Sequence, residues 1–255
     1  MPQGEDMNTI PKIIHYCWFG RNPLPELAEK CIASWRKYLP DYEIKEWNED
    51  NFDVKMTPYV EEAYYMKKYA FVSDFARFYI LYHHGGIYFD VDVEVLKPMD
   101  DILAKGPYMG LEKMEGSKKG RSVAVAAGLG MAAYPKMPIF GEMVKYYNKH
   151  HFISWRGKFS STVVVIATKL LQQHQTIDLD NVTLCEGVYI YPDEYFDPMN
   201  YYTGEVTITE NTRSIHLYAA SWTEPAPTSF WQKHSTRFKN LMVRLKLSIK
   251  RLFRL

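Results

Sequence analysis

The amino-acid sequence predicts an α/β protein built on a doubly wound sheet. Two observations lead to this prediction: the chain opens with a strand, a helix and a second strand, and a long helical segment later runs directly into a strand tipped with acidic residues. A strand-helix-strand order favours parallel strands with helices packed against the sheet. Because no repeat or low-complexity linker interrupts residues 1–230, we expect one domain there and a basic amphipathic helix over residues 231–255.

The opening unit consists of three short segments. Residues 12–18 (KIIHYCW) form an apolar run closed by a Pro-rich turn, which is typical of a buried strand. Pro25 and Glu26 then start a helix, whose apolar positions recur every three to four residues as far as Leu39. Residues 42–47 (YEIKEW) alternate in polarity, which predicts the second strand.

The central feature is a helix that feeds into an acidic strand. Helical periodicity runs from Tyr59 to His84, and Gly85 and Gly86 end it as a left-handed cap. The two glycines would also leave room for a ligand to approach the backbone. Residues 87–96 (IYFDVDVEVL) predict a strand that carries three acids toward its end.

The rest of the chain predicts shorter elements of the same domain. We expect strands at residues 108–112, 123–129, 182–190, 206–208 and 214–218, and helices at residues 138–150 and 162–173.

The net charge of +1 conceals an uneven distribution. Residues 233–255 hold eight Lys or Arg and no Asp or Glu, which leaves 23 basic against 30 acidic side chains in residues 1–232. The protein is therefore a mildly acidic body with a basic tail. Its 255 residues are 47% hydrophobic and 24% charged, an ordinary globular composition that excludes disordered and fibrous classes.

Three features favour a reducing cytoplasm. The N-terminal residues carry acids and a proline where a signal peptide would carry basic and then apolar residues. The longest weakly polar run, residues 123–134, is too short for a transmembrane helix. Cys17, Cys31 and Cys185 are an odd number of cysteines without the spacing of a zinc site, which disfavours a disulfide scaffold.

Asp90 and Asp92 are the first candidates for chemistry. On a strand, residues two apart point to the same side, so both carboxylates would converge where a divalent cation could bind. Oxygen ligands suit Mg²⁺ or Mn²⁺. Solvated acids at a strand end are the simpler alternative for so short a motif.

Asp74 and Arg77 form the second candidate pair. Their spacing places them on one face of a helix, where the simplest interpretation is a surface ion pair of less than ~1 kcal/mol. However, this helix is apolar on nearly all sides, which implies burial, and a buried charged pair needs a reason. Arg77 directed at a phosphate and Asp74 at sugar hydroxyls would supply one.

These residues lie in motifs that identify a family resemblance. The run YAFVSDFARFYILYHHGGIYFDVDVEVLKPMD, with IPKIIHYCWFG before it and ITENTRSIHLYAASW after it, resembles the DxD glycosyltransferases of family 32 over about residues 10–223. The resemblance implies a GT-A-type, Rossmann-like fold and a metal-dependent hexosyltransferase. Many bacterial members of this family build capsular polysaccharide or lipopolysaccharide.

The resemblance also implies roles for individual residues. Trp18 would stack on the donor's nucleobase, although core packing is the alternative. Asp74 and Arg77 would hold the donor sugar and its phosphate. Asp90 and Asp92 would form the metal motif, with Asp92 as the direct ligand and Asp90 reaching ribose, sugar or metal-bound water. His216 would be a further ligand of the metal or of the diphosphate.

Other positions concern the diphosphate, a further ligand, the acceptor side and the nucleotide. Ser221 and Trp222 would close over the diphosphate. Leu217 replaces a second histidine of many bacterial members, so one ligand role is missing here. Residues 160–165 (SSTVVV) replace a Gly-Pro of relatives on the acceptor side. The stretch WNEDNFD would border the nucleotide through Asn48, Asp50 or Asn51.

The expected reaction moves a hexose from a nucleotide diphosphate, a UDP-sugar before a GDP-sugar, to a saccharide hydroxyl with retention at the anomeric carbon. The sequence shows no nucleophile of the kind retaining hydrolases use, so we favour front-face substitution.

The basic tail predicts a membrane partner. Apolar residues from Phe238 to Phe253 recur every three to four positions among Lys and Arg, the pattern of an interfacial amphipathic helix. Residues 234–255 would then hold the protein on the anionic inner face of the plasma membrane, near a lipid-linked oligosaccharide acceptor. Packing on the body or on another subunit is the alternative.

Two rival functions remain open. IYFDVDVEV also resembles the DxD strand of haloacid-dehalogenase-like phosphatases, with Asp90 as nucleophile and Asp92 as acid and base, although Val93 stands where Gly is usual. A catalytically idle nucleotide-sugar-binding protein is the second rival. We expect no nucleic-acid partner, because the body is acidic.

Overall fold

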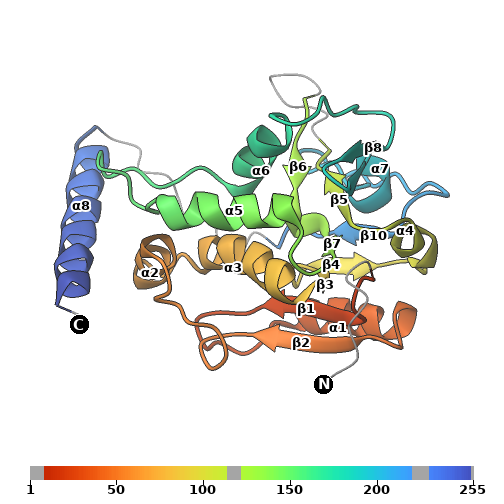
Figure 1. Ribbon diagram of the computed structural model, residues 1–255, viewed down its shortest axis with the longest axis horizontal. Coiled ribbons are helices and arrows are strands. Elements are labelled where there is room, and N and C mark those ends of the chain that lie inside the picture. Colours follow the sequence, from red (N-terminus) through yellow and green to blue (C-terminus); the bar gives the residue numbers. More distant parts are fainter. Residues whose placement is uncertain (1–8, 114–121, 220–229, 254–255) are drawn as a thin grey trace.

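A central sheet organises the computed structural model, which describes residues 9–113, 122–219 and 230–253 (Figure 1). Within those ranges the sheet has eight strands in the order β2-β1-β3-β7-β5-β9-β8, with β6 paired to β5, and β10 pairs with β4 in a separate ribbon. The strands are β1 (Ile13–Cys17), β2 (Glu43–Trp47), β3 (Gly86–Tyr88), β4 (Val93–Val95), β5 (Tyr108–Leu111), β6 (Val125–Ala126), β7 (Met131–Ala133), β8 (Thr183–Cys185), β9 (Val188–Tyr191) and β10 (Ser214–His216).

Helices cover both faces of this sheet (Figure 1). They are α1 (Glu26–Tyr38), α2 (Pro58–Tyr65), α3 (Tyr69–His84), α4 (Asp100–Lys105), α5 (Pro138–Lys149), α6 (Val163–Leu171), α7 (Asp193–Phe196) and α8 (Phe230–Leu252), with a 3-10 turn η1 (Ala127–Leu129). The predicted α/β class and the C-terminal helix are confirmed.

Alternating side chains of the strands divide the core into two layers. Ile14 and Ile87 pack with α1 and α4 on one face of the sheet, whereas Cys17 and Tyr88 pack with α2, α3, α5 and α6 on the other. Successive residues of a strand point to opposite faces, so each buried strand serves both layers. This explains why the inner strands β3, β5 and β7 are apolar throughout, whereas the edge strand β2 carries charged residues.

The predicted helix over residues 59–84 is wrong in one respect, because it is two helices. The α2 helix ends with a Schellman motif, in which Lys67 N donates to Tyr64 O (2.9 Å) and Lys68 N to Ala63 O (2.9 Å). Lys67 takes a positive φ of 56° at the position where glycine is usual. Since no glycine marks this break, periodicity alone could not locate it.

The predicted strand over residues 87–96 is also wrong. It splits into β3, which pairs with β1 and β7, and β4, which pairs with β10. A turn between them is closed by Val93 N donating to Asp90 O (3.0 Å). The chain therefore leaves the main sheet at Phe89 and enters a second ribbon at Val93.

The two glycines after α3 serve the sheet and not a ligand. Both have positive φ, 64° at Gly85 and 92° at Gly86. A Cβ at Gly85 would lie 2.7 Å from Pro135, and one at Gly86 would lie 2.6 Å from Ile13 O. The expected approach of a ligand to this backbone is therefore wrong, because neighbouring chain fills the space.

The remaining differences concern short elements. Residues 206–208 form only an isolated bridge between Val206 and Met199, and residues 182–190 form the β8-β9 hairpin instead of one strand. The predictions omitted α4, α7 and β7, which are too short to show a period.

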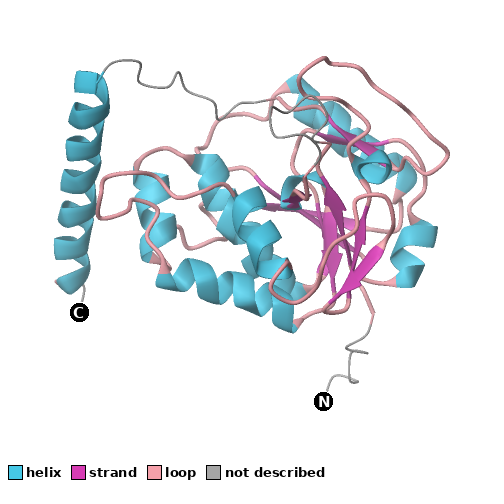
Figure 2. Cartoon of the chain, turned by 90° about the horizontal axis from the view of Figure 1, so that it is seen from above, coloured by secondary structure: helices cyan, strands magenta, loops and turns pink. Residues whose placement is uncertain are grey.

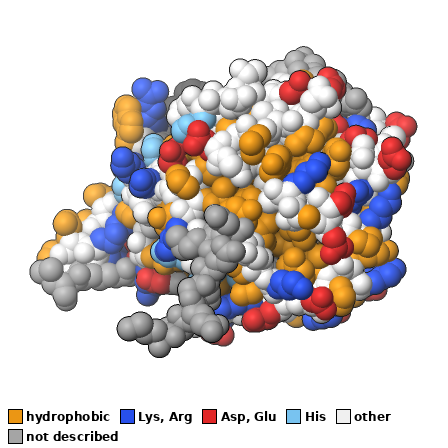
Figure 3. Space-filling model, turned by 45° about the vertical axis from the view of Figure 1, so that its right-hand side comes forward, with side chains coloured by type: hydrophobic (Ala, Val, Ile, Leu, Met, Phe, Trp, Pro, Cys, Tyr) orange, Lys and Arg blue, Asp and Glu red, His pale blue; other side chains and the backbone are white. Residues whose placement is uncertain are grey.

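The surface and the ends of the chain complete the fold. Figure 2 shows α8 standing at one end of the molecule, and no helix within the described ranges is long and apolar enough to cross a bilayer. On the face drawn in Figure 3, acidic and basic side chains are interspersed around a central group of hydrophobic ones. In contrast to this mixed surface, α8 contains basic residues but no Asp or Glu.

His15 gives a stability prediction. Its Nδ1 accepts a hydrogen bond from Trp47 Nε1 (3.0 Å), which can only donate, so the proton lies on Nε2, 3.1 Å from Gly85 O. Burial lowers the pKa of His15 from 6.5 to about 4. The unfolded chain therefore binds a proton that the native protein does not between these pH values, and stability falls as the pH drops through this window.

We expect this titration to contribute about 3 kcal/mol of lost stability between pH 6.5 and pH 4. Urea unfolding of the parent and of His15→Gln across this range measures it. The variant is the less stable protein at pH 7, and the difference should shrink by about that amount toward pH 4. A difference that stays constant with pH would contradict the assignment.

Candidate metal and nucleotide site

Three parallel strands bring the candidate residues to one edge of the sheet. The strands β2, β1 and β3 are neighbours and run in the same direction. Asn48 directly follows β2, Trp18 directly follows β1, and Asp90 lies two residues beyond β3. In open α/β sheets, ligands bind outside the carboxyl ends of such strands.

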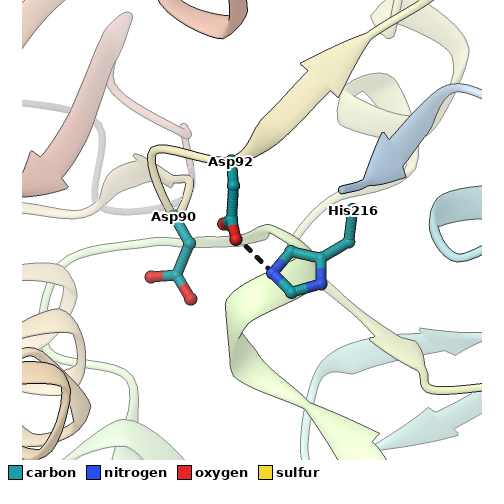
Figure 4. Close-up of side chains that lie close together, drawn as sticks. All are labelled: Asp90, Asp92 and His216. Atoms are coloured by element: carbon teal, nitrogen blue, oxygen red, sulfur yellow. Dashed lines mark ion pairs between the residues drawn. The ribbon is translucent and has the colours of Figure 1, made fainter. Parts of the chain in front are cut away.

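Asp90, Asp92 and His216 converge beside this edge (Figure 4). One ligand atom from each lies within 4.8 Å of the others. His216 Nε2 lies 3.1 Å from Asp92 Oδ1, and the β10-β4 pairing, which sets His216 opposite Val93, brings these side chains together. The carboxylates meet because of the turn between β3 and β4, not because they share a face of a strand, so the geometric reason expected from the sequence was wrong.

Asp92 and His216 shift each other's pKa in opposite directions. Burial raises the pKa of Asp92, but the hydrogen bond and charge of His216 and the N–H of Ala219, 3.0 Å from Oδ2, outweigh it, so the pKa lies below its usual range. Burial likewise opposes protonation of His216, but Asp92 raises its pKa overall. Asp92 is therefore an ionised carboxylate aimed at the site.

Asp90 is surrounded on three sides. Its Oδ1 accepts from Tyr88 Oη (2.9 Å) and lies 3.2 Å from Arg77 Nη2. Its Oδ2 lies against Gly128 of η1, where any Cβ would collide with it. Burial raises the pKa of Asp90, partly offset by Arg77. The carboxylate of Asp90 is thus held in one orientation by Tyr88 and Arg77, and Gly128 leaves the space that this orientation needs.

Asp74 and Arg77 are buried, with 7% and 3% of their surface exposed. Arg77 Nη2 lies 3.1 Å from Asp74 Oδ1, so one guanidinium bridges Asp74 and Asp90, while its Nε donates to Ser73 O (3.1 Å). Burial raises the pKa of Asp74 to about 7, against the opposing effect of Arg77. The surface ion pair considered from the sequence is excluded by this burial.

Trp18 lines a small pocket at the same edge. The other lining residues are Arg21, Asn22, Pro23, Glu46, Asn48 and Glu49. The indole is half-buried and its Nε1 donates to Asn22 O (2.7 Å). Of the three residues left open in WNEDNFD, Asn48 lines the pocket, whereas Asp50 pairs with Arg21 (2.6 Å) and Asn51 accepts from Asn48 N (2.9 Å).

Two of the expected residues cannot be placed. Ser221 and Trp222 lie outside the described residues. The neighbouring segment is described as far as Ala219, whose N–H reaches Asp92, and Leu217 N donates to Asp92 O (2.9 Å). The side chain of Leu217 packs against the core, so this position carries no ligand.

The structure adds residues that the sequence did not single out. Asp197, fully buried at the end of α7, accepts from Tyr218 Oη (2.7 Å) and Lys113 N (2.8 Å), and burial raises its pKa to about 6. The Tyr218 ring packs edge-on against His216, with centroids 4.3 Å apart. Tyr88 and Gly128 complete the surroundings of Asp90. Tyr88 lay within the GGxYxDxD motif, but no local pattern marks Asp197 or Gly128.

The donor set fits a divalent cation. Two carboxylates and an imidazole suit Mn²⁺ or Mg²⁺. His216 faces the carboxylates with Nε2, 3.1 Å from Asp92 Oδ1, and a cation held by all three side chains would take the place of the proton on that nitrogen. The fold and these residues define an α/β protein with a candidate divalent-metal site and, at the same edge of the sheet, a pocket lined by Trp18.

Comparison with known protein families finds a match over part of the chain. Residues 25–108 match the family described as glycosyltransferase sugar-binding region containing DXD motif. The match agrees with the resemblance to the DxD glycosyltransferases of family 32 and covers about a third of the chain. It includes Asp74, Arg77, Asp90 and Asp92.

Several similar curated proteins are named as transferases. Inositol phosphoceramide mannosyltransferase 1 of Schizosaccharomyces pombe is 31% identical over 115 residues, which cover 41% of this chain and 34% of that protein. An uncharacterized glycosyltransferase, L373, of Acanthamoeba polyphaga mimivirus is 26% identical over 205 residues, 75% of this chain and 76% of that one. The match thus spans about a third of the first relative's length.

Solved structures show a weaker similarity. The PaToxG glycosyltransferase superposes with a TM-score of 0.47 and 22% identity, over 64% of this chain and 69% of that one. A glycosyltransferase involved in glycosylation of the major capsid of PBCV-1 gives a TM-score of 0.46 and 10% identity, over 91% and 100%.

Proposed function

We propose that this protein is a metal-dependent, anomer-retaining glycosyltransferase. It moves a hexose from a nucleotide diphosphate sugar, a UDP-sugar in the first instance, to a hydroxyl of a lipid-linked saccharide during synthesis of a capsular or surface polysaccharide. The observation that supports this proposal is the convergence of Asp90, Asp92 and His216 within 4.8 Å at the sheet edge that also carries the Trp18 pocket.

Each residue of the site would contact a different part of the donor. Trp18 offers a ring face for the nucleobase, and Asn48 borders the same pocket. Asp90, Asp92 and His216 would hold Mn²⁺, which when bound stabilises the charge that develops on the departing phosphate. Arg77 provides a preorganised positive charge that need not reorient during the reaction. Asp74, beside it, would accept hydrogen bonds from sugar hydroxyls.

Retention is explained by front-face substitution. The bond between the anomeric carbon and the β-phosphate oxygen breaks, and the bond to the acceptor oxygen forms on the same face. The departing β-phosphate oxygen takes the proton of the acceptor hydroxyl, so no enzymic nucleophile is needed. Trapping a sugar covalently on a carboxylate of the protein would overturn this step.

The phosphatase alternative receives no support from the comparisons, because the match over residues 25–108 contains the whole IYFDVDVEV segment. The idle binding protein is a matter for experiment, since it would use the same residues without turnover.

The test is release of UDP or GDP from UDP-glucose, UDP-galactose and GDP-mannose, with Mn²⁺ or with EDTA. GDP-mannose is included because several relatives are named mannosyltransferases. We expect turnover of one donor with Mn²⁺, none with EDTA, and a loss of about 10²-fold in Asp92→Asn.

Asp41→Asn is the matched control, because this exposed carboxylate pairs only with Lys12 (3.5 Å) among the ion pairs described. Turnover of Asp92→Asn equal to that of the parent would overturn the metal assignment. Hydrolysis of p-nitrophenyl phosphate without turnover of any sugar nucleotide would favour the phosphatase, and donor binding without turnover would favour the idle protein.

A further inference from the structure

The C-terminal helix α8 carries an apolar stripe on its outer side. The stripe consists of six exposed side chains: Phe238, Met242, Leu245, Ile249, Leu252 and Phe253. Their exposed fractions run from 46% to 81%. The first five recur every three to four residues along one side of the helix, and Phe253 directly follows its last residue. The body of the protein therefore leaves most of the apolar surface of α8 uncovered.

The opposite side of α8 is attached to the body. Asn240 and Leu247 are each 3% exposed, and Asn240 Nδ2 donates to Gly157 O (3.0 Å). Arg244 donates to Ile153 O (3.0 Å). At 100° per residue, this inner side lies roughly opposite the apolar stripe. The helix cannot turn its stripe inward without losing these contacts.

Arg251 attaches the C-terminal end of α8 to α2. Its guanidinium lies 2.8 Å from Glu61 Oε2 and 3.3 Å from Glu62 Oε1, and Glu62 is fully buried in α2. A buried carboxylate that lost this partner would be strongly destabilised. The basic residue is thus used for attachment, and the rotation of α8 about its axis is set by the fold.

A column of lysines borders the stripe. Lys239, Lys246 and Lys250 are exposed and lie along one flank of the stripe at helical spacing. Residues 233–255 contain no Asp or Glu. A second copy of α8 packed on the stripe would bring a second set of lysines close to the first, and like charges would oppose that contact. An anionic lipid surface has the complementary charge and accepts the apolar side chains.

We propose that α8 lies flat on an anionic lipid surface, with the stripe inserted among the acyl chains and the lysine column on the headgroups. Figures 1 and 2 place α8 at one end of the molecule beside α2, so a plane against its outer side meets the helix along its length. The helix of 23 residues is about 35 Å long. This proposal does not depend on the transferase reaction.

The test is sedimentation of the full chain with sucrose-loaded vesicles of phosphatidylcholine alone or with one quarter phosphatidylglycerol. We expect binding to the anionic vesicles and a loss of at least tenfold in affinity for Leu245→Gln/Ile249→Gln, which alters only exposed side chains. Each of Lys239→Gln and Lys250→Gln should cost about fivefold. Val206→Gln/Ile208→Gln, at exposed apolar positions of the body, is the matched control and should bind as the parent does.

Three results would overturn the proposal. The first is equal binding of the parent and the stripe variant, and the second is no binding of the parent to anionic vesicles. The third is a dimer of the parent, seen by light scattering, that Leu245→Gln/Ile249→Gln converts to a monomer, because a second copy would then cover the stripe. Donor turnover in solution is unaffected by any of these results, so failure here is distinguishable from failure of the proposed reaction.

Discussion

Arg77→Met is expected to lower donor turnover by about 10³-fold and the free energy of unfolding by about 3–5 kcal/mol. The guanidinium lies within 3.2 Å of both Asp74 and Asp90, and its removal takes the ion pair from a buried carboxylate, Asp74, and from a partly buried one, Asp90. Part of the loss of stability is relieved because Asp74, whose pKa is already about 7, takes up a proton. Urea unfolding and UDP or GDP release measure the two effects separately.

The double variant Arg77→Met/Asp74→Asn distinguishes a catalytic role from a structural one. Removing one of the unpaired carboxylates should restore a part of the stability lost in Arg77→Met. It should not restore turnover, because no positive charge returns to the donor phosphate. Turnover of Arg77→Met within threefold of the parent, with stability reduced as expected, would leave Arg77 a structural residue only.

The sequence predicted well what depends on short-range patterns. The strand-helix-strand opening appears as β1, α1 and β2 within one or two residues, because burial repeats at 2.0 and 3.6 residues in the chain itself. The C-terminal helix was found for the same reason. The candidate site residues of the SDxxR and DxD motifs fall within one cluster, although the sequence could not show how closely.

The sequence failed where distant segments decide the local backbone. Residues 87–96 have the composition of one strand, but β7 and β1 engage only its first part and β10 only its last. The turn at Asp90 and Asp92 results from this competition. No local pattern could show it, since β1 lies about 70 residues earlier in the chain, and β7 and β10 lie about 45 and 120 residues later.

The same dependence on distant segments explains why the sequence did not predict Gly128 and Asp197 around the site. Gly128 precedes no predicted turn and its φ is not positive, so conformational freedom is not what requires a glycine there. The glycine is required because the carboxylate of Asp90, in the turn that follows β3, occupies the space of a Cβ. Asp197 was hidden for the same reason, since its partners Tyr218 and Lys113 belong to other segments.

Gly128→Ala is therefore expected to impair the site while leaving the fold intact. The added Cβ would collide with Asp90 Oδ2 and lie 3.4 Å from Arg77 Nη1, whereas the backbone of η1 accepts alanine without strain. Asp90 would have to turn away from the position set by Tyr88 and Arg77. A displacement of about 1 Å can cost about 10²-fold in turnover, and we expect a loss of that order in UDP or GDP release.

The matched control is Gly141→Ala in α5, where the Cβ would press on the ring of Tyr82 and on no residue of the candidate site. Both variants should unfold cooperatively, and only Gly128→Ala should bind Mn²⁺ more weakly, by at least tenfold, in a titration without donor. Because Mn²⁺ binding is measured apart from turnover, the experiment separates displacement of Asp90 from a general loss of activity. Parent-like Mn²⁺ affinity in Gly128→Ala would show that Asp90 does not hold the metal, and would leave Asp92 and His216 as its protein ligands.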